Sequence, residues 1–308
     1  MTFEELKAQL RLPVVAAPMM LVSGPELVIA AGRAGILGAF PALNARTTAQ
    51  LKEWLERIDG TLDGRHYAVN LIVQGPGAPR FADDLAMIEA AKPPVVITSV
   101  GDPSMAAQRI HAFGGLVFHD VATLRHARKA IEAGVDGLIL LTAGAGGHTG
   151  TANPFAFVSQ VRAFWDGPLL LAGGIADGNG VAAARTLGAD LVYMGTRFIA
   201  SEESMASAEY KELLVSQTMA DIVLTDRISG LAATFLRGSI VRAGLDPDAL
   251  PERLGIFKPN LPEGIKAWRD IWSGGHGVGS ITDTPPVAEI VNRLAAEYDS
   301  AKMRALVL

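Results

Sequence analysis

One histidine of this chain lies in a glycine-rich stretch that could support acid–base chemistry. His148 belongs to the run AGAGGHTG (residues 143–150), which follows an aliphatic segment. An imidazole has a pKa of about 6.5 and can accept a proton near neutral pH, and a flexible glycine loop would let it reach a flat ligand. The run lacks the spacing G-x-G-x-x-G and a Walker lysine, so it indicates neither a dinucleotide-binding loop nor a P-loop. The alternative is a solvent-exposed loop histidine, but a position at a predicted strand end favours a general base.

Two further glycine-containing loops could bind an anion. They are LAGGIADG (residues 171–178) and YMGTRF (residues 193–198), and each follows an aliphatic run. Small residues let backbone amides approach an anion at the N-terminus of a helix. The alternative is that Gly173 and Gly174 only form a tight turn. Two such loops in succession favour a phosphate site.

The other polar residues at predicted strand ends give weaker signals. His119 and Asp120 end one predicted strand, where they either face the site or, for Asp120, cap the helix that starts near Ala122. His276 lies in another glycine-rich loop, expected to be mobile, and the remaining histidines are expected at the surface. No His/Asp/Glu cluster has metal-ligand spacing, so we expect no metal site. A G-x-S-x-G elbow and paired strand-end acids are also lacking, which argues against a serine hydrolase and a glycosidase.

These residues need elements that position them, and short aliphatic runs alternate with longer amphipathic ones along the chain. Such alternation predicts parallel βα units with strands buried on both faces. The expected strands are residues 14–18, 36–40, 67–73, 95–99, 115–119, 137–141, 168–172 and 190–194. The expected helices between them are residues 48–57, 81–91, 103–113, 122–133, 154–165 and 178–187. This order predicts an α/β protein, a (β/α)8 TIM barrel with its site at the strand C-termini, and leaves a doubly wound sheet as the alternative.

After residue 200 the alternation stops. The following segment is rich in prolines and is expected to be helical or irregular. Residues 286–298 again have apolar side chains at helical spacing, which suits an eighth helix that closes the barrel. We therefore expect a barrel formed by residues 1–204 and 283–308, and a helical insertion, residues 205–282, that covers the active site.

The composition excludes several classes of protein. The 308 residues include no Cys, which excludes disulfides, thiolate zinc sites and Cys nucleophiles. A net charge of −5 without a Lys/Arg run indicates no nucleic-acid partner and no membrane surface. No apolar run approaches the roughly 20 residues of a membrane span, and acids stand where a signal peptide needs a basic region. These features favour a cytoplasmic protein that acts on a small molecule.

Several stretches, in order, resemble the nitronate monooxygenases, formerly called 2-nitropropane dioxygenases. They are PVVAAPMM (13–20), NL (70–71), GGHTG (146–150), AGGIADG (172–178) and MGTRF (194–198). The resemblance covers about residues 13–200 and extends weakly to residues 272–275 and 285–286. These motifs are specific for FMN-binding barrels and less specific for the reaction, because flavin-dependent enoyl reductases and NADH:quinone reductases have similar barrels.

The resemblance implies that FMN lies across the barrel mouth. Its phosphate would lie on Gly173, Gly174, Gly195 and Thr196, and its ring would lie against the backbone of residues 18–20. The cofactor residues that it implies are Pro18, Met19, Met20, Asn70, Gly146, Gly147, Ala172, Gly173, Gly174, Met194, Gly195 and Thr196.

The resemblance also implies a reaction. His148 coincides with the catalytic base of the family, which would remove the α-proton of a neutral nitroalkane. Alkyl nitronates, and nitroalkanes as further substrates, would be oxidised with O2 to a carbonyl compound and nitrite. The alternative enzyme is an NAD(P)H-dependent flavin reductase that acts on a quinone or an enoyl thioester. A third reading is an FMN-binding protein without turnover, against which the potential base argues.

Two residues depart from the pattern of the family. Asp120 stands where a lysine is common, and Leu141 stands where an aspartate is common. Both positions are expected to face the ligand, so the substrate is not carried over from the family. The apolar character of the insertion favours a homodimer.

Overall fold

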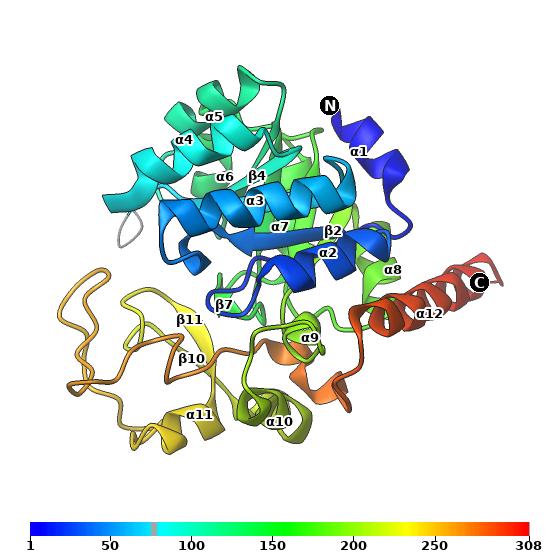
Figure 1. Cartoon of the computed structure of the whole chain (residues 1–308). Coiled ribbons are helices and arrows are strands. Elements are labelled where there is room, and N and C mark those ends of the chain that lie inside the picture. The colour runs from blue at the N-terminus through cyan, green and yellow to red at the C-terminus, as the bar shows by residue number, and fades with distance from the viewer. Residues whose placement is uncertain (75–78, 308) are drawn as a thin grey trace.

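The structure is a computed structural model that describes residues 1–74 and 79–307, with side chains described up to residue 305 (Figure 1). Residues 75–78 and 308, which fall within the expected barrel segments, lie outside this description. Eight parallel strands close a barrel in the order β1-β2-β3-β4-β5-β6-β8-β9. They are β1 (Val14–Ala16), β2 (Leu37–Pro41), β3 (Tyr67–Ile72), β4 (Val95–Ser99), β5 (Leu116–Val121), β6 (Gly137–Leu141), β8 (Leu169–Ala172) and β9 (Leu191–Met194). The predicted barrel is confirmed, and the doubly wound alternative is wrong.

The strands read as continuous apolar runs because both of their faces are buried. On β5, Leu116 and Phe118 pack inside the barrel, whereas Val117 packs against the surrounding helices. Side chains alternate between the two faces of a strand. His119 therefore points toward the helices, and Asp120, at the C-terminal end of the same strand, points into the barrel mouth.

Helices surround the barrel and close its N-terminal end. Phe3 of the first helix packs edge-on against Phe118, with ring centroids 6.1 Å apart. Thr123 caps α6, because its side chain accepts from the His126 amide, so the alternative in which Asp120 caps this helix is wrong. The helices are α1 (Phe3–Gln9), α2 (Pro25–Arg33), α3 (Thr48–Leu62), α4 (Phe81–Ala91), α5 (Ser104–His111), α6 (Leu124–Glu132), α7 (Pro154–Arg162) and α8 (Gly178–Leu187).

The last helix, α12 (Val287–Val307), returns to the barrel and packs against α8 and α2 (Figure 1). Val287, Val291 and Leu294 are buried in the core between the barrel and its helices. The carboxylate of Glu297 accepts a hydrogen bond from the Gly178 amide at 2.7 Å. This helix occupies the place expected for the eighth helix of the barrel.

The segment between β9 and α12 contains strands as well as helices. Its elements are α9 (Thr196–Ile199), α10 (Ala208–Ser216), η3 (Met219–Asp221), β10 (Ile222–Thr225), β11 (Ala233–Leu236), α11 (Arg237–Arg242) and η4 (His276–Ser280). The strands β10 and β11 pair antiparallel, and β11 also pairs with β7 (Gly147–His148). The expectation of a purely helical or irregular segment missed these strands because each has four residues and gains its partner from elsewhere in the chain. The division into a barrel and an insertion domain stays a prediction.

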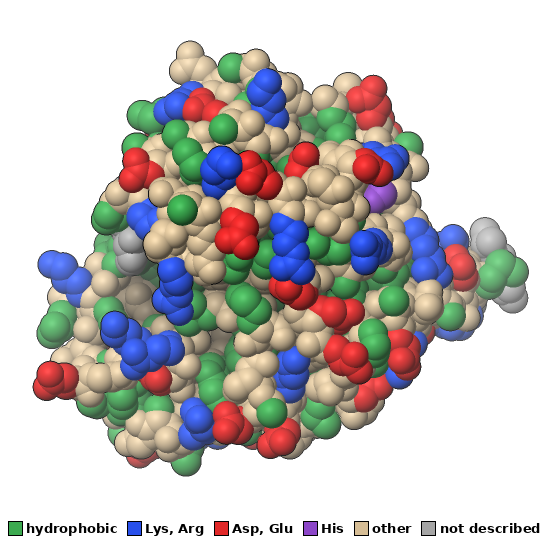
Figure 2. All heavy atoms as spheres, in the orientation of Figure 1, with side chains coloured by type: hydrophobic (Ala, Val, Ile, Leu, Met, Phe, Trp, Pro, Cys, Tyr) green, Lys and Arg blue, Asp and Glu red, His purple; other side chains and the backbone are tan. Residues whose placement is uncertain are grey.

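The surface shows mixed charges on the face seen in Figure 2. Acidic and basic side chains are interspersed there, with apolar side chains among them. None of the described helices is both long enough and apolar enough to span a bilayer.

Candidate active site

A cavity of about 1010 Å³ opens at the C-terminal ends of the barrel strands. Its lining includes His148 and every residue that the sequence assigned to the cofactor, so the predicted site residues are brought together from five separate stretches. Leu231, Phe257, Trp268 and Ser273 of the segment after β9 also line the cavity. The volume lies at the upper end of the range that is usual for small-molecule sites.

The rim of the cavity after β1 is held by a buried asparagine. Asn44, which ends the short helix η1 (Ala42–Asn44), accepts a hydrogen bond from the Leu21 amide at 2.8 Å. Its Nδ2 donates to the carbonyl oxygens of Met19 at 2.9 Å and Ser23 at 2.8 Å. The Ser23 hydroxyl accepts from the Met19 amide at 3.0 Å. The backbone against which the flavin ring was expected to lie is thus fixed by side chains outside the strand.

The loop after β8 leaves room for a ligand at one glycine. At Gly173, with φ +137°, a Cβ would lie 2.2 Å from Thr142 Oγ1, so a side chain is excluded. At Gly174, with φ +67°, a Cβ would meet no described atom within 4 Å. The turn therefore leaves open space beside Gly174, although the Gly174 amide itself donates to the Gly144 carbonyl at 3.3 Å.

Two amides at the N-terminus of α8 have hydrogen-bond partners within the chain. The Gly178 amide donates to the Glu297 carboxylate at 2.7 Å, and the Gly180 amide donates to Asp177 at 2.7 Å. Two of the first three amides of this helix are thus already bonded within the chain, which argues against a phosphate at this helix, and the position of the phosphate stays a prediction. The space beside Gly174 is the part of the loop that stays open.

The loop that carries His148 is anchored on both sides. The short strand β7 places His148 opposite Ala233 of β11. The Gly147 amide donates to Ser273 Oγ at 2.6 Å, and Thr149 Oγ1 donates to the Thr142 carbonyl at 2.8 Å. The expectation of a flexible glycine ribbon is therefore wrong, because the segment after β9 pairs Gly147 and His148 with β11 and bonds the residues beside them.

His276 contributes to this anchoring through its backbone. It lies at the start of η4, and its amide donates to the Gly144 carbonyl at 2.9 Å. The glycine-rich loop around it, expected to be mobile, forms this short helix against the His148 loop. His276 thus supports the site through its main chain.

The imidazole of His148 is packed within the cavity wall. Its ring meets Trp268 edge-on, with centroids 5.2 Å apart and planes at 88°. Its Nε2 is buried and has no hydrogen-bond partner in the part of the chain that the structure describes. Burial lowers the pKa of His148, so the ring is neutral at pH 7 and can accept a proton. The alternative of a solvent-exposed loop histidine does not hold.

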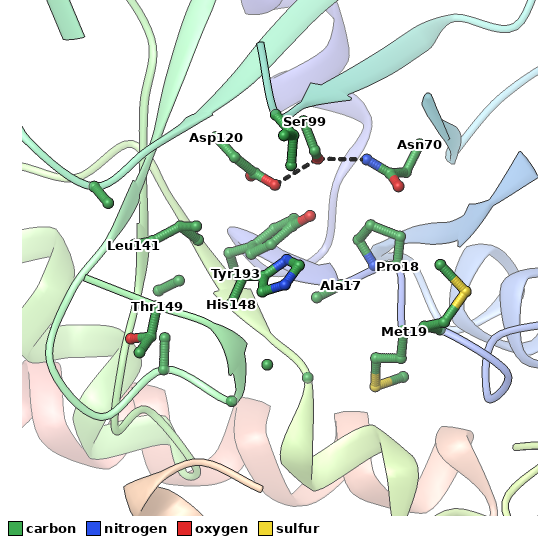
Figure 3. A pocket seen from close by; sticks show the side chains of 18 of the residues that line it. Ala17, Pro18, Met19, Asn70, Ser99, Asp120, Leu141, His148, Thr149 and Tyr193 are labelled. Atoms are coloured by element: carbon green, nitrogen blue, oxygen red, sulfur yellow. Dashed lines mark hydrogen bonds between the residues drawn. The ribbon is translucent and has the colours of Figure 1, made fainter. Parts of the chain in front are cut away.

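A row of polar side chains lies at the ends of β3, β4 and β5 (Figure 3). Asn70 Nδ2 lies 2.7 Å from Ser99 Oγ, which lies 2.6 Å from Asp120 Oδ2. Burial raises the pKa of Asp120 to about 7. From the sequence, Asn70 was assigned to the cofactor and Asp120 was noted as a residue that could face the site, but Ser99 was missed. The signal that could have found Ser99 is its position as a polar residue at the end of a largely apolar strand.

Two further titratable residues, His119 and Tyr193, lie near this row. His119 Nδ1 lies 2.8 Å from Thr98 Oγ1 on the helix side of the strands, and burial lowers the pKa of His119 to about 4. Tyr193, which the sequence reading also missed, lines the cavity from β9. Burial, followed by the nearby charge of Asp120, raises the pKa of Tyr193, so its phenol stays protonated.

Residues 1–74 and 79–307 contain no group of three or more His, Cys, Asp or Glu side chains that could hold a metal ion.

The family model described as nitronate monooxygenase matches residues 4–297. The chain belongs to the nitronate monooxygenase family. It is therefore related to flavin-dependent oxidoreductases along almost its whole length.

Two curated relatives illustrate the range of the family. A nitronate monooxygenase of Pseudomonas aeruginosa is 29% identical over 266 residues, covering 72% of this chain and 75% of that protein. A Rhodococcus jostii protein named (3aS,4S,5R,7aS)-5-hydroxy-7a-methyl-1-oxo-octahydro-1H-indene-4-carboxyl-CoA dehydrogenase is 29% identical over 231 residues. That match covers 75% of this chain but 64% of the dehydrogenase.

Two solved structures have the same architecture over nearly the whole chain. Nitroalkane oxidase from Streptomyces ansochromogenes superposes with a TM-score of 0.82 at 25% identity, covering 97% of this chain and 99% of that chain. FabK from Thermotoga maritima superposes with a TM-score of 0.80 at 28% identity, covering 99% of each chain.

Proposed function

We propose that this protein is an FMN-dependent nitronate monooxygenase that oxidises alkyl nitronates with O2 to a carbonyl compound and nitrite. The observation that carries the proposal is His148, a neutral and partly buried imidazole in the wall of a cavity at the barrel mouth, in a chain of this family. When bound, the flavin supplies the redox chemistry, with electrons passing from the nitronate to O2. The polypeptide supplies the binding surface and the proton transfer.

The cofactor is FMN rather than FAD. The open turn at Gly174, together with Gly195 and Thr196 across the loop after β9, suits a single phosphate group. The strict Rossmann spacing G-x-G-x-x-G, which would hold a pyrophosphate and an adenosine, is absent from the sequence. Mass spectrometry of the released chromophore tests the assignment, and recovery of FAD would contradict it.

The residues of the chain have separate roles in this reaction. His148 removes the α-proton when the substrate arrives as a neutral nitroalkane, and it is dispensable for a nitronate that has already lost this proton. Leu231, Phe257 and Trp268 line the same cavity and keep water from the reacting carbon. Small alkyl groups suit this apolar wall.

A flavin reductase or dehydrogenase that acts on a coenzyme A thioester is the second candidate. The relative from R. jostii favours this second candidate, because the name of that protein specifies a carboxyl-CoA substrate. The cavity also extends past the barrel mouth to Ser104, His126 and Lys129 on α5 and α6, which gives room for a longer substrate.

Anaerobic mixing distinguishes the two candidates. The purified yellow protein is mixed with ethylnitronate in one experiment and with NADH in another, and the flavin absorbance is followed. We expect the nitronate to bleach the flavin and NADH to leave it oxidised. Bleaching by NADH alone would favour the reductase, and a colourless protein would contradict both candidates.

A further inference from the structure

The hydrogen-bonded row at the ends of β3, β4 and β5 has a defined direction. Asn70 Nδ2 donates to the Ile97 carbonyl at 3.1 Å, which fixes the amide orientation because only the NH2 group can face a carbonyl oxygen. The second N–H of the same group therefore faces Ser99 Oγ at 2.7 Å. Ser99 accepts from Asn70 and uses its own hydrogen to donate to Asp120 Oδ2 at 2.6 Å. Asn70 Oδ1 is left as a hydrogen-bond acceptor at the cavity.

This row faces the glycine loops across the barrel mouth. In the closed order of strands, β3 lies opposite β8 and β4 lies opposite β9. The loops after β8 and β9 carry Gly174 and Thr196, to which the phosphate is assigned. A flat ligand that is anchored there and extends across the mouth presents its far edge to Asn70 and Asp120.

No cationic side chain of the described residues bonds to Asp120. Its polar neighbours are Ser99 from β4 and Tyr193 from β9, while His119 on its own strand faces the helices and is neutral. Asp120 Oδ1 is buried without a hydrogen-bond partner among the described residues. An ionised carboxylate would leave this oxygen unsatisfied and its charge unpaired, so the site favours the protonated acid. The pKa of Asp120, raised to about 7 by burial, agrees with this geometry.

We propose that Asp120 sets the redox potential of the cofactor. As a neutral carboxylic acid, Asp120 donates a hydrogen bond to the polar edge of the flavin ring that lies far from the phosphate. Where Asp120 is ionised, its carboxylate takes up a proton when the flavin is reduced. This inference rests on the proposed FMN site. The reduced ring is an anion, so a donor stabilises it and a nearby carboxylate destabilises it. Asn70 Oδ1 accepts from the N–H of the same edge.

The proton balance of reduction then depends on the state of Asp120. With Asp120 protonated, the oxidised flavin takes up two electrons and one proton to give the anionic hydroquinone. With Asp120 ionised, the same two electrons are accompanied by two protons, the second of which protonates the carboxylate. For a two-electron couple these cases give about 30 and about 59 mV per tenfold change in proton activity.

The flavin midpoint potential of the holoenzyme, measured between pH 5 and pH 9, tests the proposal. We expect the slope of the wild type to exceed that of Asp120→Asn above about pH 7, because the amide cannot take up the second proton. Ser99→Ala serves as a positioning control. The Ser99 hydroxyl stabilises the carboxylate of Asp120 and so lowers its pKa. Loss of this hydroxyl should therefore move the pH range in which the potential falls more steeply to higher pH. Equal slopes in the wild type and Asp120→Asn would overturn the role of Asp120.

A second measurement on the flavin-free full chain separates this inference from the proposed function. In the infrared difference spectrum, wild type minus Asp120→Asn, a protonated-carboxyl band should be present at pH 6 and absent at pH 9, because the difference cancels the bands of the other acids. A difference spectrum without this band at pH 6 would overturn the inference. A protein that binds no flavin would overturn the proposed function, whereas a flavoprotein with equal slopes would overturn only the role of Asp120.

Discussion

His148 combines an anchored backbone with an imidazole that is neutral at pH 7. If it is the general base, His148→Asn should lower kcat/KM for a neutral nitroalkane by about 10²- to 10⁴-fold. A preformed nitronate should lose much less, because its proton has already been removed. Steady-state oxygen consumption with the two substrates measures the contrast. Equal losses on both would mean that His148 positions the substrate, and no loss on either would remove it from the mechanism.

The pH profile of the neutral substrate gives an independent check on His148. A general base acts when it is unprotonated, so activity should rise with pH through the pKa of His148. Burial lowers this pKa, and the rise should therefore be centred below the unperturbed value of about 6.5. The rise should be absent from His148→Asn. A rise that persists in the variant would assign the ionisation to another group.

A substitution at Gly174 tests where the phosphate of the cofactor lies. Its Cβ would point into open space, so Gly174→Asp should place a carboxylate in the cavity without a clash. Repulsion between the carboxylate and the phosphate should give folded but largely colourless protein. Flavin occupancy is measured by absorbance after gel filtration.

Gly244→Asp is the matched control for this substitution. Gly244 also has a positive φ, +78°, and an open Cβ position, but it does not line the cavity. Both variants therefore carry similar backbone strain, and only the change at position 174 should remove the flavin. Full occupancy in Gly174→Asp would move the phosphate site elsewhere.

At the scale of elements, the short helix η1 supports the loop after β1 through Asn44. Asn44→Ala removes three hydrogen bonds from the buried backbone of this loop, which should lower the free energy of unfolding by about 2–4 kcal/mol. The rim residue Met19 would lose one of its two side-chain anchors and keep the bond to Ser23, so the dissociation constant of FMN should rise by about tenfold, which corresponds to about 1.4 kcal/mol. Urea unfolding and fluorescence titration measure the two effects.

A substitution at a second asparagine serves as a control that separates an effect on stability from an effect on FMN binding. Asn153 caps α7 at the surface, and Asn153→Ala should cost about 1 kcal/mol of stability while FMN affinity is unchanged. If Asn44→Ala destabilises the fold but binds FMN as the wild type does, the loop after β1 does not contact the cofactor.

At the scale of the whole molecule, the last helix determines whether the barrel is complete. Leu294 of α12 is 2% exposed in the core, and Leu294→Ala should destabilise the protein by about 2–5 kcal/mol. Met303 on the same helix is 63% exposed, and Met303→Ala should change stability by less than about 0.5 kcal/mol. Circular dichroism and flavin fluorescence should report one common transition. Separate transitions would mean that α12 does not belong to the barrel domain.

The homodimer stays a prediction at the same scale. Leu224, Leu254 and Ile256 of the segment after β9 are large apolar side chains that are exposed on the single chain. Sedimentation equilibrium of the wild type should give twice the monomer mass. A monomer at micromolar concentration would contradict it.

The sequence by itself determined the order of the eight barrel strands and of most of the helices between them, the barrel they form, and the stretches that meet at its mouth. Each of these depends on local patterns: apolar runs of strand length, helical periodicity, and glycines that follow a strand. Because parallel strands of a barrel all end at the same rim, residues as distant as Met19 and Thr196 could be placed together without coordinates. The family resemblance rests on the same local stretches, which is why it also was available from the sequence.

Only the tertiary structure decided which side chains touch. The direction of the row from Asn70 through Ser99 to Asp120 depends on the register of three strands, and a shift by one residue would turn Asp120 toward the helices and His119 toward the ligand. The anchoring of His148 depends on β11, which lies more than eighty residues away and has no local signal for this pairing. Such contacts are set by how the segment after β9 folds back over the barrel, and no periodicity in the sequence encodes that path.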